Sequence, residues 1–315
     1  MFDILAITGP IYLAIAVGYL CTRAELFTRA DMRVFGQFVI KLALPCLLFT
    51  ALSQRNISEI ANPSYALAYL GGTLTLITLA LLWAKHKGLS STEGVVAAMG
   101  MTCSNSSFVG YPILLLTVAP VAGVALALNT LVENLLVIPL LLALAERSRG
   151  KDGHWVVKLG QSSRSLAKNP IVLSLVAGLL VSWMRWTLPE PITRTVNLFG
   201  VASAGLSLFV IGGTLVGLQV KGLRRVVAQI TFGKLILHPL AVLLVVLWLV
   251  PVGDVHLRTA LLLTASMPML SIYPILAQKH GHEDLGAAAL LVTTIASFFT
   301  LSTLLWVMKH TTFLG

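Results

Sequence analysis

Polar residues gather at two places in this sequence where long apolar runs would otherwise be continuous. The first is the stretch NSSFVGYP, Asn105–Pro112, which follows Ser104 inside an apolar run from about 95 to 118. The second is SMPMLSIYP, Ser266–Pro274, inside another apolar run. Serine, asparagine, glycine and proline weaken or interrupt helical hydrogen bonding. Each stretch therefore predicts a broken helix whose hydroxyl and carboxamide groups can bind a solute.

A broken helix attracts ions of opposite sign at its two new ends. The second half begins with N–H groups that carry partial positive charge, and the first half ends with carbonyl groups of opposite polarity. Two such helices that cross suit a carboxylate together with a coupling cation. The alternative is that the polar residues only cap the break. The candidate substrate-binding residues are Asn105, Ser104, Ser106, Ser107, Tyr111, Pro112, Met267, Ser271, Tyr273 and Pro274.

Few ionisable residues lie inside the apolar runs, and the cost of burying charge in a membrane makes each of them a functional candidate. Glu133 follows Asn129 by one helical turn, and Lys234 precedes His238 by one turn. These four residues are candidates for ion coupling or charge relay, although each charge could instead be a paired structural one. Lys41 and Lys234 are two cations inside the apolar runs, and Glu133 is the one acid set against them. This excess of positive charge favours an anionic solute.

The composition is that of a membrane protein. The chain has 315 residues, of which 57% are hydrophobic and 11% charged, and its mean hydropathy is +0.90. Soluble domains carry about 25% charged residues. The long, continuous apolar runs predict helices rather than the short alternating strands of a barrel. We expect an all-α, multi-pass protein of the cell (inner) membrane, and its N-terminal apolar run is expected to be a first span rather than a signal peptide.

Several kinds of chemistry are not expected. The net charge of +10 is spread between apolar runs and forms no basic stripe with interleaved aromatics, so nucleic acid is not an expected partner. The loop residues His280, His282, Glu283 and Asp284 resemble a metal cluster only superficially, and we expect no metal and no cofactor. The sequence has no convergent nucleophile and base, so we expect no enzyme, and it has no GxxxxGK[ST] loop, so we expect no ATP-driven transport by this chain alone.

Ten apolar segments have about the 20 residues that a helix needs to cross a bilayer. Segments one to five form a first unit at 1–145, a basic linker follows at 146–169, and segments six to ten form a second unit at 170–315. The ten predicted spans are 3–20, 33–52, 64–84, 94–118, 122–145, 170–186, 195–218, 226–250, 257–278 and 285–308.

Charge asymmetry predicts the orientation of these spans. Fifteen Lys and Arg residues lie at the loops that join odd-numbered spans to the next, and five lie on the opposite side. Basic loops stay in the cytoplasm. Both termini are therefore expected on the non-cytoplasmic side.

The two halves also resemble each other. GPIYLAIAVGYL, 9–20, matches NPIVLSLVAGLL, 169–180, and TCSNSSFVGYPIL, 102–114, matches TASMPMLSIYPIL, 264–276. The offset stays between 160 and 163 residues. Five spans per unit is an odd number, so the second unit must be inverted in the membrane. Its broken ninth span is then expected to cross the broken fourth span near the midplane.

Together, NSSFVGYP, LALPCLLF (42–49), the NPI start of span six and MPMLSIYP resemble the auxin efflux carrier family in its bacterial form. The similarity covers essentially the whole chain. It implies a bile-acid-symporter-like fold, with spans 1, 2, 6 and 7 as a scaffold and the others as a moving core. It also implies a carboxylate substrate, auxin-like or malate- or malonate-like. The family's crossover Asn falls on Asn105, and its crossover prolines fall on Pro112 and Pro274.

We therefore expect a secondary active or facilitative transporter of a small organic carboxylate, which works by alternating access, of the elevator or rocking kind. One alternative is a sodium- or proton-coupled symporter of a bulkier anion, and another is a receptor of the same fold that does not transport. Span seven is rich in glycine, including Gly200, Gly205, Gly212 and Gly213. Such a helix can pack tightly within the scaffold, join two copies in a homodimer, or offer a smooth surface for sliding.

Overall fold

The structure, a computed structural model, describes residues 2–55, 62–147, 168–218, 224–278 and 280–310. All named elements in these ranges are helical, which confirms the predicted all-α class. The predicted basic linker lies mostly outside them. In the first half the elements are α1 Phe2–Arg23, α2 Arg29–Phe38, η1 Val39–Ala43, α3 Leu44–Ser53, α5 Pro63–His86, α6 Ser91–Thr102, η2 Ser106–Gly110, α7 Tyr111–Thr117, α8 Ala119–Val132, η3 Glu133–Val137 and α9 Ile138–Arg147.

The described elements of the second half include two long helices, α12 Glu190–Thr214 and α17 Glu283–His310. The others, in chain order, are α11 Pro170–Met184, α13 Arg224–Phe232, η4 Gly233–Leu237, α14 His238–Trp248, α15 Val255–Ala265 and α16 Tyr273–Gln278.

Within the described ranges, six helices are long and apolar enough to cross a membrane, which confirms a multi-span protein; the count of ten spans stays a prediction. Many large apolar side chains point outward from these helices, as lipid contact requires, and Trp248 is 81% exposed and Phe299 66% exposed. The six candidate spans are Arg29–Ser53, Pro63–His86, Ala119–Ala145, Glu190–Thr214, Arg225–Trp248 and Glu283–His310. Shorter apolar helices are Ser106–Thr117, Pro170–Met184 and Val255–Ala265.

Helical structure is interrupted inside the second predicted stretch and at the very start of the first, where residues 106–112 are helical after all. Helix α6 ends at Thr102, and η2 begins at Ser106; α15 ends at Ala265, and α16 begins at Tyr273. The residues between the helix ends include Asn105, whose side chain caps η2, and Pro268, which has no N–H to donate.

Four π-helical turns, η1 to η4, each end two residues before a proline: Pro45, Pro112, Pro139 and Pro239. In each turn the residue just before the proline donates its N–H to the carbonyl five residues back, as Tyr111 does to Ser106. A proline ring would clash with the carbonyl four residues back in a regular helix, and a widened turn relieves that clash. The prolines thus widen the helices locally without ending them.

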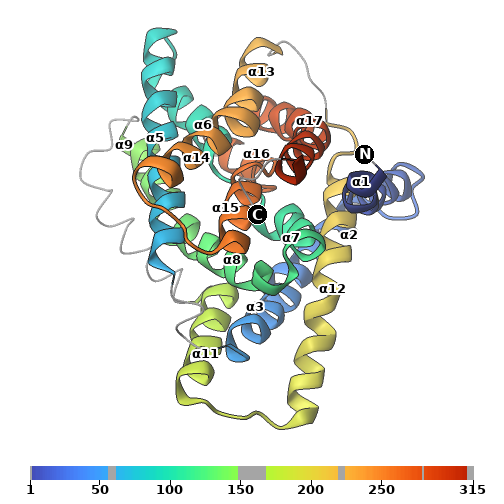
Figure 1. Cartoon of the computed structure of the whole chain (residues 1–315). Coiled ribbons are helices and arrows are strands. Elements are labelled where there is room, and N and C mark those ends of the chain that lie inside the picture. The colour runs from blue at the N-terminus through green and yellow to red at the C-terminus, as the bar shows by residue number, and fades with distance from the viewer. Residues whose placement is uncertain (1, 56–61, 148–167, 219–223, 279, 311–315) are drawn as a thin grey trace.

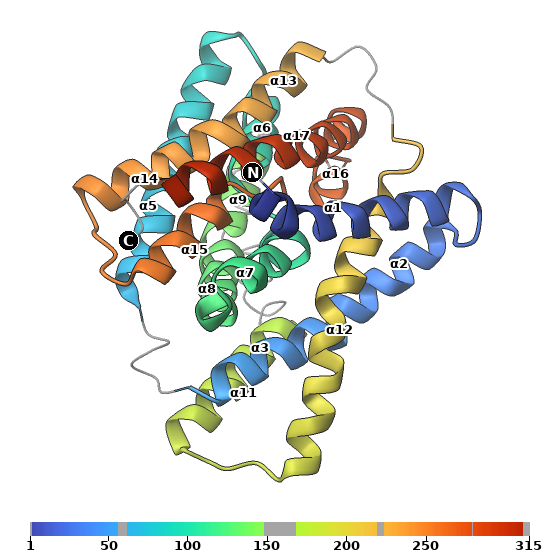
Figure 2. The same ribbon diagram turned by 45° about the vertical axis from the view of Figure 1, so that its right-hand side comes forward.

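The helices form two groups, which both views of the ribbon separate (Figures 1 and 2). In one group α12 packs along α1, α2, η1 and α3, and α11 packs on α3. In the other, α5 packs on α6 and α14, while α17 packs on α13 and α16. Contacts of α3 with α8, of α12 with η2, and of α1 with α7 and α17 join the groups. Figure 2 shows the first group running from α1 and α2 on the right, down along α12, to α3 and α11 at the bottom.

The glycines of α12 serve mainly to bring helices of the first group together. A Cβ atom at Gly212 would lie within van der Waals overlap of the Ile15 carbonyl in α1, and one at Gly213 would overlap Met32 in α2. A Cβ atom at Gly205 would meet nothing within 4 Å. Of the three interpretations of this helix, tight packing within the scaffold is therefore the one that the contacts favour.

Candidate functional site

The two interrupted segments lie against each other and pair through their backbones. Ser104 and Met269 form an isolated antiparallel bridge. The N–H of Asn105 donates to the Pro268 carbonyl at 2.9 Å, and the N–H of Leu270 donates to the Cys103 carbonyl at 3.1 Å. Backbone groups released by one break are thus satisfied by the other, as groups at membrane depth require.

Asn105 is the central residue of this pairing and is only 1% exposed. Its side-chain oxygen accepts from the N–H of Phe108 at 3.2 Å and caps η2, while its Nδ2 donates to Ser271 Oγ at 2.7 Å. Its backbone carbonyl accepts from Val109 and Gly110. In this conformation the carboxamide therefore both caps its own helix and links the two breaks.

The hydroxyl of Ser106 sits at the start of the helix Ser106–Thr117. It is buried, and within the described ranges its Oγ has no hydrogen-bond partner. A buried hydroxyl without a partner costs about 1–3 kcal/mol. Because N–H groups of the first helical turn point in the same direction, this position suits an anionic oxygen.

A buried network of polar side chains lies directly beside Ser104. Lys234 Nζ lies 2.8 Å from each of three acceptors: Ser104 Oγ, His238 Nδ1 and the Ala265 carbonyl. These three acceptors use all three protons of an ammonium group. Lys234 and His238 are fully buried, so the lysine is held by hydrogen bonds in place of water.

The same serine connects Lys234 to Glu133. Glu133 Oε1 accepts from the Tyr69 hydroxyl at 2.6 Å and from the Ser104 N–H at 3.0 Å. Tyr69 Oη and Ser104 Oγ are 3.1 Å apart. Since the single proton of Tyr69 goes to the carboxylate at the shorter distance, the Ser104 hydroxyl donates to Tyr69. Hydrogen bonds therefore run without a gap from Lys234 through Ser104 and Tyr69 to Glu133.

His238 adds a second link between the network and α5, the helix that also carries Tyr69. Its Nε2 lies 3.0 Å from the Thr73 hydroxyl, and its Nδ1 also approaches the Ala265 carbonyl at 3.1 Å. With Lys234 donating to Nδ1, the ring proton must be on Nε2, where it donates to Thr73. This tautomer satisfies both nitrogens.

Other predicted residues have different surroundings. Asn129 is fully buried, and neither atom of its carboxamide has a partner within the described ranges. The Tyr273 hydroxyl donates to the Val96 carbonyl at 3.0 Å, which is a structural contact. Pro274 packs against Gly286, and Met267 packs against Gly110 beside the pairing. Pro112 is buried in α7, Ser107 is half-buried, and Lys41 is exposed.

Sequence reasoning missed Tyr69 and Thr73. With Tyr65 they recur every four residues in α5, and all three are fully buried. Residues four apart share one face of a helix. This polar stripe in an apolar span is a signal that points to the network face of α5. Within the described ranges, no group of three or more His, Cys, Asp and Glu residues could hold a metal.

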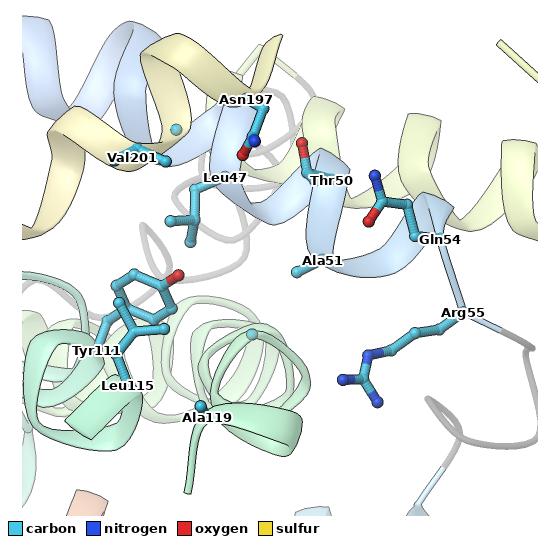
Figure 3. A pocket seen from close by; sticks show the side chains of 12 residues that line it. Leu47, Thr50, Ala51, Gln54, Arg55, Tyr111, Leu115, Ala119, Asn197 and Val201 are labelled. Carbon is cyan, nitrogen blue, oxygen red and sulfur yellow. The ribbon is translucent and has the colours of Figure 1, made fainter. Parts of the chain in front are cut away.

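A cleft of about 620 Å³ opens between the two helix groups (Figure 3). Leu47 and Thr50 of α3, Gln54 directly after α3, and Asn197 of α12 line one wall. Tyr111, a predicted site residue of α7, lines the other wall, and its ring faces Leu47. The cleft thus reaches the helix that begins at the first break, whereas Asn105 and Ser104 are not among its lining residues.

Comparison with known proteins agrees with these features. The family model described as "Membrane transport protein" matches residues 7–307. A "Putative malonate transporter" of Rhizobium meliloti is 29% identical over 321 residues, which cover 98% of this chain and 97% of that protein. The "Uncharacterized transporter YfdV" of Escherichia coli K12 is 27% identical over 310 residues, 95% of each chain. The family match spans nearly the whole sequence and agrees with the resemblance carried by the two broken spans, so this chain belongs to the membrane transport protein family of auxin efflux carriers.

Proposed function

We propose that this protein carries a small organic carboxylate across the cell membrane by alternating access at the crossing of its two broken helices. The observation on which the proposal rests is the pairing of Ser104 with Met269, flanked by the Asn105–Ser271 hydrogen bond. Paired discontinuous helices in two halves of a chain are typical of binding sites in secondary transporters. The relative named as a malonate transporter favours a short, malonate- or malate-like acid.

The first break offers groups that suit a carboxylate. The Ser106 hydroxyl lacks a partner within the described ranges, and the first turn of the helix Ser106–Thr117 presents N–H groups with partial positive charge. Asn105 can turn its Nδ2 from Ser271 to a solute while its Oδ1 still caps the helix. Binding of the acid would then loosen one link between the two breaks.

The packing of the helices favours a division into scaffold and moving core. α1, α2, α3, α11 and α12 would form the scaffold, and the remaining helices would form the core. Ser207 Oγ of α12 lies 3.0 Å from the Phe108 carbonyl of η2, so the scaffold touches the core next to Asn105. The proposal also includes the arrangement of the spans as two inverted units of five, with both termini outside the cytoplasm.

The network from Lys234 to Glu133 favours a coupled form of transport. An inside-negative potential opposes uptake of each negative charge by about 2.3 kcal/mol per 100 mV, whereas export of a monoanion is helped by the same amount. Uptake would therefore need a proton or sodium ion. The unbroken hydrogen-bond chain through Tyr69 and Ser104 favours a proton, carried at Glu133 and relayed with Lys234 and His238. Such coupling would also serve a symporter of a bulkier anion.

The test measures flux of malonate, malate and indole-3-acetate into proteoliposomes, with and without proton and sodium gradients. Asn105→Ala should abolish or strongly reduce the flux that the native protein supports. Asn134→Ala is the matched control, because Asn134 Nδ2 bonds only a carbonyl of its own helix among the contacts described, that of Thr130 at 2.9 Å.

Two outcomes would contradict this proposal. Unchanged flux in folded Asn105→Ala protein would remove Asn105 from the site. Saturable binding of an acid by the native protein without any flux, under every gradient, would favour the receptor alternative over transport.

A further inference from the structure

A groove of about 560 Å³ lies among α5, α6, α13 and η4, on the outer surface of the protein. Its lining side chains are apolar, apart from Arg225 and Gln229 of α13 and the indole N–H of Trp83. Leu79 and Phe232, which form part of its walls, are 53% and 55% exposed. This α5–α13 groove therefore opens toward the surrounding lipid, whereas the cleft of Figure 3 opens between the two helix groups.

The groove has a polar end at one surface of the membrane. Trp83 lies in the last turn of α5, and Arg225 lies in the first turn of α13. Figures 1 and 2 both show these two helix ends at the top of the molecule. Tryptophan is enriched where spans meet the lipid headgroups. At 1.5 Å per residue, the stretch from Arg225 to Phe232 is about 10 Å long, so the groove runs from headgroup level into the hydrocarbon.

Arg225 supplies an unmatched positive charge at the polar end. Its side chain is exposed, and it forms no ion pair or hydrogen bond with the residues that the structure describes. Lys85 and His86 in the last turn of α5 add to the basic character of this surface. A guanidinium binds a phosphate through two parallel hydrogen bonds. An anionic phosphate at headgroup level is therefore the group that matches Arg225.

The inner end of the groove touches elements that hold the buried network. Met101 lies in α6 directly before the first break, and Leu237 is the last residue of η4, the turn that carries Lys234. A Cβ atom at Gly233 would overlap Met101, so η4 and α6 are in direct contact here. An acyl chain in the groove would pack against both elements and hold them together.

We infer that the α5–α13 groove binds an anionic phospholipid, with one acyl chain along its apolar walls and the phosphate on Arg225. Basic pockets between spans bind anionic lipid headgroups in other membrane proteins. A free anion would match only the polar end, because the apolar walls require an apolar chain to cover them. The inference goes beyond the proposed function, since it concerns other residues and needs no carboxylate substrate.

The experiment places the full-length protein in nanodiscs that mix phosphatidylcholine and phosphatidylglycerol, one of which carries bromine on its acyl chains. Bromine quenches nearby tryptophan fluorescence, and the difference between native protein and Trp83→Phe isolates the signal of Trp83. This signal should show a preference for phosphatidylglycerol of about fivefold, the effect of one basic residue near a membrane surface. Trp248, 81% exposed on α14 and not in the groove, should show a preference below about twofold.

Substitutions at the polar end separate a site from diffuse surface charge. Arg225→Gln should reduce the preference at Trp83 to below about twofold, whereas Arg225→Lys should retain most of it, because lysine keeps the charge. Lys85→Gln is the matched control, since it removes a positive charge from the last turn of α5 at a residue that does not line the groove. It should leave a preference of about threefold or more. No preference at Trp83 in the native protein, or equal losses in Arg225→Gln and Lys85→Gln, would overturn the inference.

A second measurement keeps Arg225 intact. Ala228 lines the groove and is exposed, so Ala228→Phe fills the groove without entering the protein core. This variant should lose the preference at Trp83, and Ala228→Ser should keep it. A preference that survives in Ala228→Phe would place the lipid outside the groove and overturn the inference. Neither readout uses transport, so failure here would leave the proposed function standing, and unchanged flux in Asn105→Ala would leave the lipid site standing.

Discussion

The buried charges Glu133 and Lys234 should depend on each other for stability, although Ser104 and Tyr69 lie between them. Glu133→Gln tests this with little disturbance, because both hydrogen bonds to Glu133 end on the same oxygen, Oε1. A glutamine can keep an oxygen there and lose only the charge. Lys234→Met removes the charge and three donors, which leaves its three acceptors unpaired.

Removing one member of a buried charge pair typically costs about 3–5 kcal/mol, since the other charge is left uncompensated. We expect Glu133→Gln at the lower end of that range and Lys234→Met at the upper end. The double variant should lose about 1–3 kcal/mol less than the sum of the two single losses, because residues in one network share their interaction energy. The coupling reports the charges, since the hydrogen bonds of Glu133 survive in the glutamine variant.

The assay is reversible unfolding in mixed detergent micelles, followed by tryptophan fluorescence, for native, single and double variants. The same cycle on Glu190 and Arg194 provides the control, because this exposed pair, 2.5 Å apart, should couple by about 0.5 kcal/mol or less. A buried coupling no larger than the exposed one would refute the reasoning, since it would mean that the two charges do not sense each other through the network.

Three further changes test other parts of the fold. Gly212→Ala should destabilise the protein by more than about 1 kcal/mol in the same unfolding assay, because its Cβ would overlap a backbone carbonyl of α1. Gly205→Ala is the control and should be neutral or stabilising by up to about 1 kcal/mol. Equal effects of the two substitutions would contradict the packing of α12 on α1. Tyr69→Phe should cost about 1.5–3 kcal/mol by removing a donor to the buried carboxylate, and a loss below 0.5 kcal/mol would argue against that bond. In the capping box of α6, hydrogen bonds from the backbone and then from the side chain of Ser90 lower the pKa of Glu93 below 4.5. The ionised Glu93 therefore stabilises the protein at pH values above the pKa it has in the unfolded chain. That stabilisation is lost as the pH falls through the lower pKa of the folded protein. Ser90→Ala should cost about 1 kcal/mol at any pH, because it removes the side-chain cap and keeps the backbone N–H that bonds Glu93. Glu93→Gln should destabilise the protein at pH 7 and lose that effect at pH 3, and an effect of Glu93→Gln that did not change with pH would exclude the linkage.

The interruptions could be predicted from the sequence because their causes are local. Pro268 removes a backbone donor at the second break, and Asn105 caps the helix that follows the first break. The pairing of the two breaks was expected only from the similarity of the two halves. Their backbone bonds depend on how the whole chain packs, which no local pattern encodes.

The partners of the buried charges were harder to predict, since they lie far away in the sequence. Glu133 and Lys234 were singled out as costly charges, yet the groups that satisfy them come from α5, the first break and the end of α15. The stripe formed by Tyr65, Tyr69 and Thr73 was visible as a four-residue repeat. Nothing in the sequence said that this stripe faces α8 and α14 instead of another neighbour.

The prolines account for the local helix geometry at the buried charges Glu133 and Lys234. Glu133 opens η3 and Lys234 is the second residue of η4, so both charges lie in π-helical turns that end two residues before a proline. A widened turn shifts the direction of its side chains from that of a regular helix and leaves carbonyls less tightly paired, and such turns often occur at functional sites. Lys41 lies in the same kind of turn, yet it is exposed and its Nζ bonds Gln37 Oε1 at 3.2 Å. The π-helical turn therefore sets the direction of the charged side chain, and the packing of neighbouring helices determines whether that side chain joins a buried network. For this reason the sequence alone groups Lys41 and Lys234 together as charges inside apolar runs.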